Sequence, residues 1–161
     1  MPIRVGVLTV SDSGAAGERE DKSGDTIVDW ICESGFELAA RELVPDETDL
    51  IVRALTLWSD DGLADVILTT GGTGFSPRDV TPEATLAVLE REAPGVAEAI
   101  RAASRERVPR SMLSRGVAGI RNATLIVNLP GSVGGVRDGI GALAPVIAHA
   151  VQILRDEPTD H

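Results

Sequence analysis

Histidine and cysteine are almost absent from this chain. Its 161 residues contain two histidines and one cysteine, Cys32. A single cysteine excludes a disulfide within the chain and a cysteine-rich zinc site. A Ser-His-Asp or Cys-His triad would have to use His149, which lies in a predicted helix, or His161, the last residue. We therefore expect no triad-type nucleophilic catalysis.

Aromatic residues and lysine are also scarce. The chain has two tryptophans, two phenylalanines, no tyrosine and one lysine, Lys22, and its formal net charge is −10. Nucleic-acid binding usually needs a basic face and aromatic stacking platforms, so no nucleic-acid partner is expected. Phosphates bound by this chain would be held mainly by backbone amides, arginines and metal.

Long apolar runs are missing as well. No segment approaches the roughly 20 apolar residues of a membrane span, and the apolar run near the N-terminus is too short for a secretory signal. We expect no membrane partner and a cytoplasmic location. The 43% apolar content suits one globular domain, residues 1–161, with a frayed tail over 156–161.

What the chain does contain is an alternation of strands and helices. Apolar strands are predicted over residues 3–10, 36–44, 65–70 and 124–128. Helices are predicted over residues 24–34, after 47, from 81 and over 133–154, with Pro145 expected to kink or break the last one. This alternation favours an α/β fold, in which helices cover both faces of a largely parallel sheet.

Residues 68–85, LTTGGTGFSPRDVTPEAT, have the layout of a phosphate-handling site. An apolar strand leads into Gly71, Gly72 and Gly74, where a ligand can approach bare backbone amides. We expect Thr81 to cap the helix that follows, and the N-terminus of a helix favours an anion. A plain tight turn is the alternative interpretation, and the segment is not a P-loop, since no Gly-Lys-Ser/Thr follows.

Asp79 lies between this turn and the helix. Because Thr81 is expected to cap the helix, the Asp79 carboxylate has no obvious structural role. A carboxylate beside a phosphate site repels the ligand unless a cation lies between them. The pattern therefore implies Mg²⁺.

Polar or glycine-containing turns follow the other three predicted strands too. In parallel sheets, ligands bind outside the carboxyl ends of the strands. Ser11 and Asp12 follow the first strand and could be plain loop residues, although a serine there is well placed to bind phosphate or ribose. Asp46 follows the second strand and could instead cap the next helix. The turn at 128–132 follows the fourth strand and could be a plain strand-to-helix connection.

Residues 101–121 carry six arginines and one acid, a basic island in an acidic chain. One interpretation is a solvated face or a subunit contact paired with acids elsewhere. The other is electrostatic guidance of polyanionic substrates.

Four segments carry a resemblance that covers most of the chain. They are TVSDSGAAGEREDKSGDTI (9–27), VPDE (44–47), TTGGTGFSPRDVTPEAT (69–85) and MLSRGVAGIRNATLIVNLPGS (112–132). Together they resemble the MoaB/Mog family of molybdenum cofactor biosynthesis. The resemblance implies a three-layer α/β sandwich, usually assembled as a homotrimer. It also implies molybdopterin adenylyltransferase activity, in which MgATP and molybdopterin give adenylylated molybdopterin and pyrophosphate.

The resemblance also implies roles for individual residues. Asp46 and Asp79 match two family aspartates required for activity, and we assign them to orienting Mg²⁺ and the triphosphate. The substrate-binding candidates are Ser11, Asp12, Gly71, Gly72, Thr73, Gly74, Ser76, Ser114, Arg115, Asn128, Pro130, Gly131 and Ser132. The implied partners are molybdopterin and the co-substrate ATP, with the molybdate-inserting protein of the pathway as a further candidate.

Two alternatives remain open at this stage. A catalytically inactive pterin-binding or scaffold protein of the same family would keep the fold, although the presence of both Asp46 and Asp79 counts against it. An insertase-like relative would be expected to carry additional domains.

Overall fold

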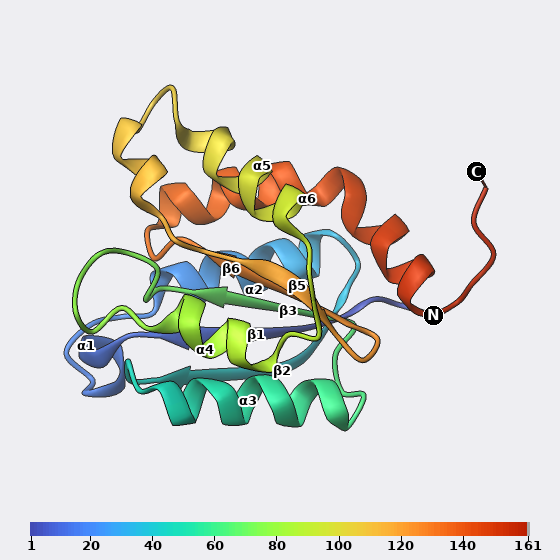
Figure 1. Cartoon of the computed structure of the whole chain (residues 1–161), viewed down its shortest axis with the longest axis horizontal. Coiled ribbons are helices and arrows are strands. Elements are labelled where there is room, and N and C mark those ends of the chain that lie inside the picture. The colour runs from blue at the N-terminus through green and yellow to red at the C-terminus, as the bar shows by residue number, and fades with distance from the viewer. Residues whose placement is uncertain (161) are drawn as a thin grey trace.

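A computed structural model describes residues 1–160, and its centre is a six-stranded sheet (Figure 1). The strands are β1 (Arg4–Val10), β2 (Glu37–Val44), β3 (Val66–Thr70), β4 (Arg91–Glu92), β5 (Ala118–Arg121) and β6 (Thr124–Leu129). Their order is β2-β1-β3-β6-β5-β4, and the first four of these are parallel to one another. The four predicted strands and their largely parallel arrangement are confirmed.

The two shortest strands were not predicted. β5 pairs antiparallel with β6, and the two-residue β4 pairs antiparallel with β5. A tight turn joins β5 to β6, with Asn122 at a positive φ of 51°, a conformation that asparagine tolerates better than most residues. Strands this short cannot show a hydrophobic period in the sequence.

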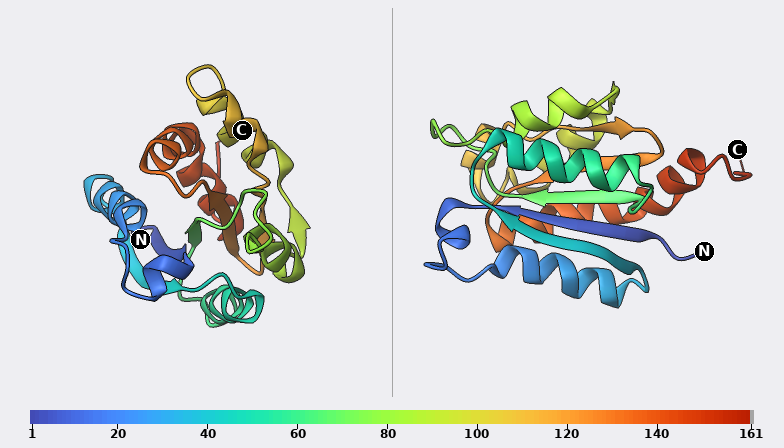
Figure 2. Two further views of the ribbon diagram at one scale, coloured as in Figure 1. Left: turned by 90° about the vertical axis from the view of Figure 1, so that its left-hand side faces the viewer. Right: turned by 90° about the horizontal axis from the view of Figure 1, so that it is seen from below.

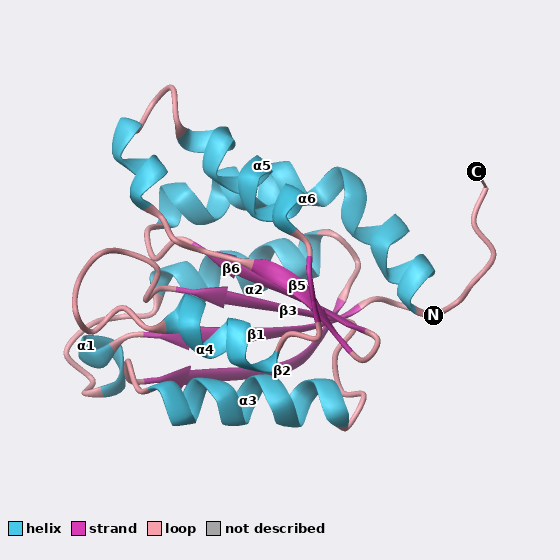
Figure 3. Ribbon diagram, viewed as in Figure 1, coloured by secondary structure: helices cyan, strands magenta, loops and turns pink. Residues whose placement is uncertain are grey.

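Helices cover both faces of the sheet (Figures 2 and 3). They are α1 (Asp12–Ala15), α2 (Lys22–Glu33), α3 (Thr48–Asp60), α4 (Thr81–Val88), α5 (Pro94–Ser104), the 3₁₀ helix η1 (Pro109–Leu113) and α6 (Val133–Leu154). One core cluster joins α2, α5 and α6 to the sheet, and a second joins α3 and α4 to its other face. The three-layer α/β sandwich is therefore confirmed. Within residues 1–160, no helix is long and apolar enough to span a membrane.

The central strands are buried on both faces, as expected for parallel strands between helical layers. All five residues of β3 are buried. On the α3 side, Trp58 packs so closely on β1 that a Cβ built at Gly6 would lie 2.8 Å from the indole Cε3. Burial of one large apolar side chain contributes about 1.5–3 kcal/mol, so this packing holds α3 against the sheet.

Helix α6 does not break at Pro145, one of the two outcomes expected from the sequence. It runs unbroken from Val133 to Leu154 with Pro145 inside it. Proline in a helix interior removes one backbone hydrogen bond and costs about 3 kcal/mol. Here the helix buries Ile140, Leu143 and Ile147, and the free energy of that burial is large enough to offset the cost.

The prediction that Thr81 caps α4 is wrong. Val80 is the N-cap residue, no side chain caps the helix, and Thr81 is the first helical residue. The Thr81 hydroxyl instead donates to the Gly71 carbonyl (3.0 Å), and its backbone N–H donates to the Gly72 carbonyl (3.1 Å). Thr81 is fully buried, so it fastens the glycine turn to α4 instead of facing a ligand.

Asp65 connects the N-terminal and C-terminal segments of the chain. It lies directly before β3, at the end of the sheet opposite the carboxyl ends of the parallel strands. Its Oδ2 accepts a hydrogen bond from the backbone N–H of Arg4 (2.8 Å) and one from Nη2 of Arg155 (2.7 Å). Burial of Asp65 opposes ionisation, but the hydrogen bonds from Arg4 and Arg155 outweigh it and lower the pKa of this carboxyl to about 2. Residues 157–160 continue without helix or strand, and residue 161 lies outside the described part of the chain.

We expect Asp65→Asn to lower the free energy of unfolding at neutral pH by about 2 kcal/mol. The folded-state pKa lies below the ordinary value of 3.8, so the stabilisation is present above about pH 4 and is lost as the pH falls from about 4 toward 2. Urea unfolding of both proteins between about pH 2 and 7 measures this. A difference that stays constant over that range would contradict the assigned role of the Asp65 charge.

Candidate functional site

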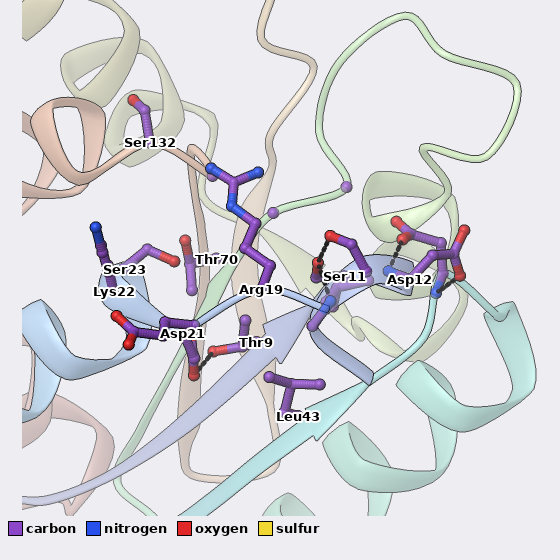
Figure 4. Close-up of a pocket in the computed structure, with 18 of the residues that line it drawn as sticks. Thr9, Ser11, Asp12, Arg19, Asp21, Lys22, Ser23, Leu43, Thr70 and Ser132 are labelled. Atoms are coloured by element: carbon purple, nitrogen blue, oxygen red, sulfur yellow. Dashed lines mark hydrogen bonds between the residues drawn. The ribbon is translucent and has the colours of Figure 1, made fainter. Parts of the chain in front are cut away.

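The carboxyl ends of β1, β2, β3 and β6 open into one cleft of about 1040 Å³ (Figure 4). In Figure 1 this is the end of the sheet where α1 and the loop after β3 lie. Nine of the residues singled out in the sequence line the cleft: Ser11, Asp12, Asp46, Gly71, Gly72, Ser76, Asp79, Gly131 and Ser132. The structure thus brings together residues from four separate strand ends.

The backbone conformation of the turn at the end of β3 requires glycine. Gly71 and Gly72 have φ angles of 95° and 68°, which side-chain-bearing residues rarely adopt. A Cβ built at Gly71 would lie 2.3 Å from the Val10 carbonyl oxygen, and one at Gly72 would lie 2.2 Å from Oγ1 of Thr81. Only glycine therefore fits at both positions, and the bare backbone of this turn lines the cleft.

Asp12 and Asp46 bind each other's backbone. The Asp12 N–H donates to Oδ2 of Asp46 (2.8 Å), and the Asp46 N–H donates to Oδ1 of Asp12 (2.9 Å). Asp46 is not a helix cap, because the N-cap of α3 is Glu47 and no side chain makes a capping bond there. This reciprocal pair instead fastens the end of β1 to the end of β2 and holds both carboxylates at the cleft.

The pKa values of these two carboxyls shift in opposite directions. Hydrogen bonds from the Arg78 side chain and the Asp46 backbone lower the pKa of Asp12. Burial raises the pKa of Asp46, and the nearby charges of Asp12 and Asp79 raise it further. Asp46 therefore lies in a field of negative charge that a bound cation would relieve.

Asp79 has a structural role that its sequence position did not indicate. Its Oδ2 accepts the backbone N–H of Ser76 (2.9 Å), which closes the loop after the glycine turn. Its carbonyl accepts a hydrogen bond from Nη2 of Arg115 (2.8 Å). The assumption that the carboxylate lacked a structural role was wrong because it considered only helix capping, whereas Asp79 binds the backbone of its own loop.

These carboxylates alone do not make a complete metal site. No group of three or more histidine, cysteine, aspartate or glutamate side chains within residues 1–160 could hold a metal ion. Mg²⁺ usually keeps several waters and binds through one or two carboxylates together with substrate phosphates. Asp46 and Asp79, both lining the cleft, fit that arrangement, with the substrate supplying further oxygens.

Six of the predicted site residues do not line the cleft: Thr73, Gly74, Ser114, Arg115, Asn128 and Pro130. Arg115 binds the loop after the glycine turn from outside the cleft. Its Nε donates to the Gly74 carbonyl (2.8 Å), and its guanidinium pairs with Glu83. Ser114 lies beside it, with its hydroxyl 3.5 Å from that of Thr73. Arg115 thus fixes the loop that carries Ser76 and Asp79, both of which line the cleft.

Asn128 is 3% exposed and its side chain is fully engaged. Its amide donates to the hydroxyls of Thr69 (2.9 Å) and Thr85 (3.0 Å), and its carbonyl accepts from the N–H of Val117 (3.1 Å). A buried amide must be paired in this way to avoid a large desolvation cost. The structure thus places Asn128 in the core, linking β3, β6 and α4.

Sequence reasoning missed the cationic part of the cleft. Arg19, Lys22 and Ser23 line it, and in Figure 4 Arg19 extends across the view from the loop between α1 and α2. Lys22 is the only lysine of the chain, and this rarity was the one feature of the sequence that could have marked it as a candidate for the cleft. Two helix N-termini also reach the cleft, those of α2 at Lys22 and of α6 at Val133. The helix N-termini that line the cleft are therefore those of α2 and α6, and at the α2 end the Asp21 carboxylate caps the helix by accepting the Gly24 N–H.

The basic island over 101–121 is largely paired within the chain. Arg101 donates to the Gly116 carbonyl (2.7 Å), Arg107 pairs with Asp138, and Arg121 pairs with Asp60 (2.9 Å). These contacts support the structural interpretation for most of the island.

Comparison with known proteins identifies relatives along nearly the whole chain. Residues 6–149 match the family described as "Probable molybdopterin binding domain". The Helicobacter pylori (strain J99) protein named molybdopterin adenylyltransferase is 41% identical over 155 residues, which cover 94% of this chain and 88% of that protein. Dictyostelium discoideum gephyrin is also 41% identical, over 164 residues, but these make up 96% of this chain and only 23% of gephyrin.

A solved structure agrees with these matches. The crystal structure of the molybdopterin biosynthesis enzyme MoaB from Thermus thermophilus superposes with a TM-score of 0.91 at 49% identity, covering 98% of this chain and 99% of that one. Both the sequence match and the fold point to the same group of proteins. The chain therefore belongs to the MoaB/Mog family of molybdopterin-binding domains.

Proposed function

We propose that this protein is a molybdopterin adenylyltransferase, a nucleotidyltransferase of molybdenum cofactor biosynthesis. It transfers AMP from ATP to the terminal phosphate of molybdopterin and releases pyrophosphate. The observation that carries the proposal is the meeting of Asp46, Asp79 and the Gly71-Gly72 turn in one cleft. The chain has this cleft and is 41% identical to a relative of that name, 88% of which it spans.

The site suits a substrate that brings its own nucleophile. The second pKa of a phosphate monoester is about 6, so at neutral pH its oxygen can attack the α-phosphorus of ATP without a general base. The new P–O bond forms as the bond to the β-phosphate breaks, and pyrophosphate leaves with the electron pair. Neither histidine is needed, and no histidine lines the cleft among the described residues. What the reaction requires is in-line positioning and neutralised charge.

The residues of the cleft divide between these two tasks. Asp46 and Asp79 would hold Mg²⁺, which when bound neutralises charge on the triphosphate. The bare amides of the Gly71-Gly72 turn, the N-termini of α2 and α6, and the side chains of Arg19 and Lys22 are placed to bind phosphate oxygens. Ser11 and Ser132 also line the cleft, although each hydroxyl already accepts a helix-capping hydrogen bond.

The direct test is product formation. Purified protein is incubated with molybdopterin and MgATP, and adenylylated molybdopterin and pyrophosphate are quantified. We expect both products in equal amounts. Tight pterin binding without either product would instead support the alternative, an inactive pterin-binding or scaffold protein of the same family.

We further propose that the protein acts as a homotrimer in the cytoplasm, with the molybdate-inserting protein of the pathway as a further partner. Apolar side chains remain on its surface, among them Phe75, Leu86 and Met112, which are 69%, 43% and 62% exposed. In a trimer, side chains of this kind would be covered in the contacts between subunits.

Light scattering after size exclusion tests the assembly. We expect about three times the chain mass of 16.8 kDa at micromolar concentration. A monomer under those conditions would contradict the trimer.

A further inference from the structure

Arg78 links the loop after β3 to the loops after β1 and β2. Its Nε donates to Oδ2 of Asp12 and its Nη2 to Oδ1 of Asp12, both at 3.0 Å. Nη2 also donates to Oε1 of Glu47 (3.0 Å). Such a two-pronged contact fixes the plane of a carboxylate as well as its position. Arg78 therefore sets how the Asp12 carboxylate lies.

Asp12 in turn sets how Asp46 lies. The reciprocal bonds between these residues, at 2.8 and 2.9 Å, leave each carboxylate accepting the other's backbone N–H. One oxygen of Asp12, Oδ1, accepts from both the Asp46 backbone and Arg78. A change in the Arg78 contact would therefore move Asp12 and, through it, the Asp46 carboxylate.

We propose that Arg78 and Asp12 are positioning residues that fix Asp46 for a divalent cation carried by the nucleotide. This inference depends on the proposed adenylyl transfer. Outer contacts of this kind orient a ligating carboxylate, and losing one typically weakens metal binding or activity about 10- to 100-fold. Arg78 differs from Arg19 and Lys22, which make no ion pair within the described residues and are placed to bind substrate directly.

The charges at this corner of the cleft support the same role. Asp12, Asp46 and Asp79 all line it, and Arg78 is the cation that pairs with one of them. Without Arg78, the repulsion between Asp12 and Asp46 would lack this balancing charge, and only the reciprocal backbone hydrogen bonds would hold the two carboxylates. The cation would then meet a less firmly fixed ligand.

Two single variants and their combination test the proposal. Arg78→Gln removes the guanidinium group that binds both oxygens of Asp12. Asp12→Asn removes the negative charge that this guanidinium binds, while leaving an oxygen to accept the Asp46 N–H. The first measurement is binding of Mn²⁺ in the presence of α,β-methylene ATP, followed by electron paramagnetic resonance. The second is the rate of AMP transfer.

We expect each single variant to weaken Mn²⁺ binding about 10- to 100-fold and to slow transfer similarly. Because both substitutions break the same Arg78–Asp12 contact, the double variant should bind Mn²⁺ no more weakly and transfer AMP no more slowly than the more impaired single variant. Arg78→Lys should recover only part of the loss, since an ammonium group cannot form the two-pronged contact. Molybdopterin binding should stay unchanged in all of them.

Arg53→Gln is the matched control, because Arg53 is exposed on α3 and makes no ion pair within residues 1–160. If wild type and this control show no transfer, the proposed function fails. If both are active and Arg78→Gln binds Mn²⁺ like wild type, the positioning role is overturned. Additive effects, with weaker binding of the metal-free ATP analogue, would also overturn it, because Arg78 would then contact the phosphates directly.

Discussion

Replacing Asp79 by asparagine is expected to lower the turnover of adenylyl transfer by at least about a hundredfold. The substitution keeps the side-chain volume and removes one negative charge from the cleft. It also keeps an oxygen that can accept the Ser76 N–H, the bond that closes the loop in the native protein at 2.9 Å. The loop should therefore keep its shape, and the loss should reflect the missing charge.

Asp61→Asn provides the matched control, since Asp61 is an exposed carboxylate at the far end of α3 and does not line the cleft. Its turnover should equal that of wild type. Asp46→Asn should resemble Asp79→Asn, because both carboxylates serve the same cation. Steady-state kinetics together with melting temperatures separates the outcomes. Wild-type turnover in Asp79→Asn would remove Asp79 from the mechanism, and a change confined to melting temperature would make it a loop residue only.

Removing the metal is expected to abolish adenylyl transfer and to leave molybdopterin binding largely intact. Asp46 and Asp79 act on the triphosphate through Mg²⁺ in the proposed mechanism, so transfer in excess EDTA should fall below about 1% of the Mg²⁺ rate. In the proposed mechanism the pterin makes contacts of its own in the cleft of about 1040 Å³, so its dissociation constant should change by less than about threefold.

The measurement is a pair, pterin binding and AMP transfer, each made with Mg²⁺ and with chelator. Restoring Mg²⁺ after chelation should restore transfer, which controls for damage to the protein. Transfer that survives complete chelation would show that the metal role assigned to Asp46 and Asp79 is wrong, even though the family membership stands. Loss of pterin binding with chelator would show that the metal holds both substrates.

The fold was predictable where the signal is local and strong. The apolar runs at 3–10 and 65–70 form β1 and β3, because a strand buried on both faces has a nearly continuous run of apolar residues. The parallel order followed from the helices between the strands. β4 and β5 were missed because they are short antiparallel strands whose formation depends on pairing with a neighbouring strand.

The site was predictable in outline for a similar reason. Ligands collect at the carboxyl ends of parallel strands, so Asp12, Asp46 and the Gly71-Gly72 turn could be placed together before the structure was known. Arg19 was missed because it lies in a polar loop with no periodicity. Asn128 was placed at the site because it lies at the end of an apolar strand, yet its amide is buried and donates to two threonine hydroxyls.

By itself, the sequence determined the fold class and the strand ends at which the cleft forms, because these depend on the periodicity of apolar residues and on the glycine turn. The family followed from the resemblance of the four segments at 9–27, 44–47, 69–85 and 112–132. Only the tertiary structure decided which polar side chains face the cleft and which are used inside the protein. Thr81 holds the glycine turn and Arg78 holds Asp12. Each contact joins two different segments of the chain, and such a hydrogen bond depends on the angles and distances that packing sets.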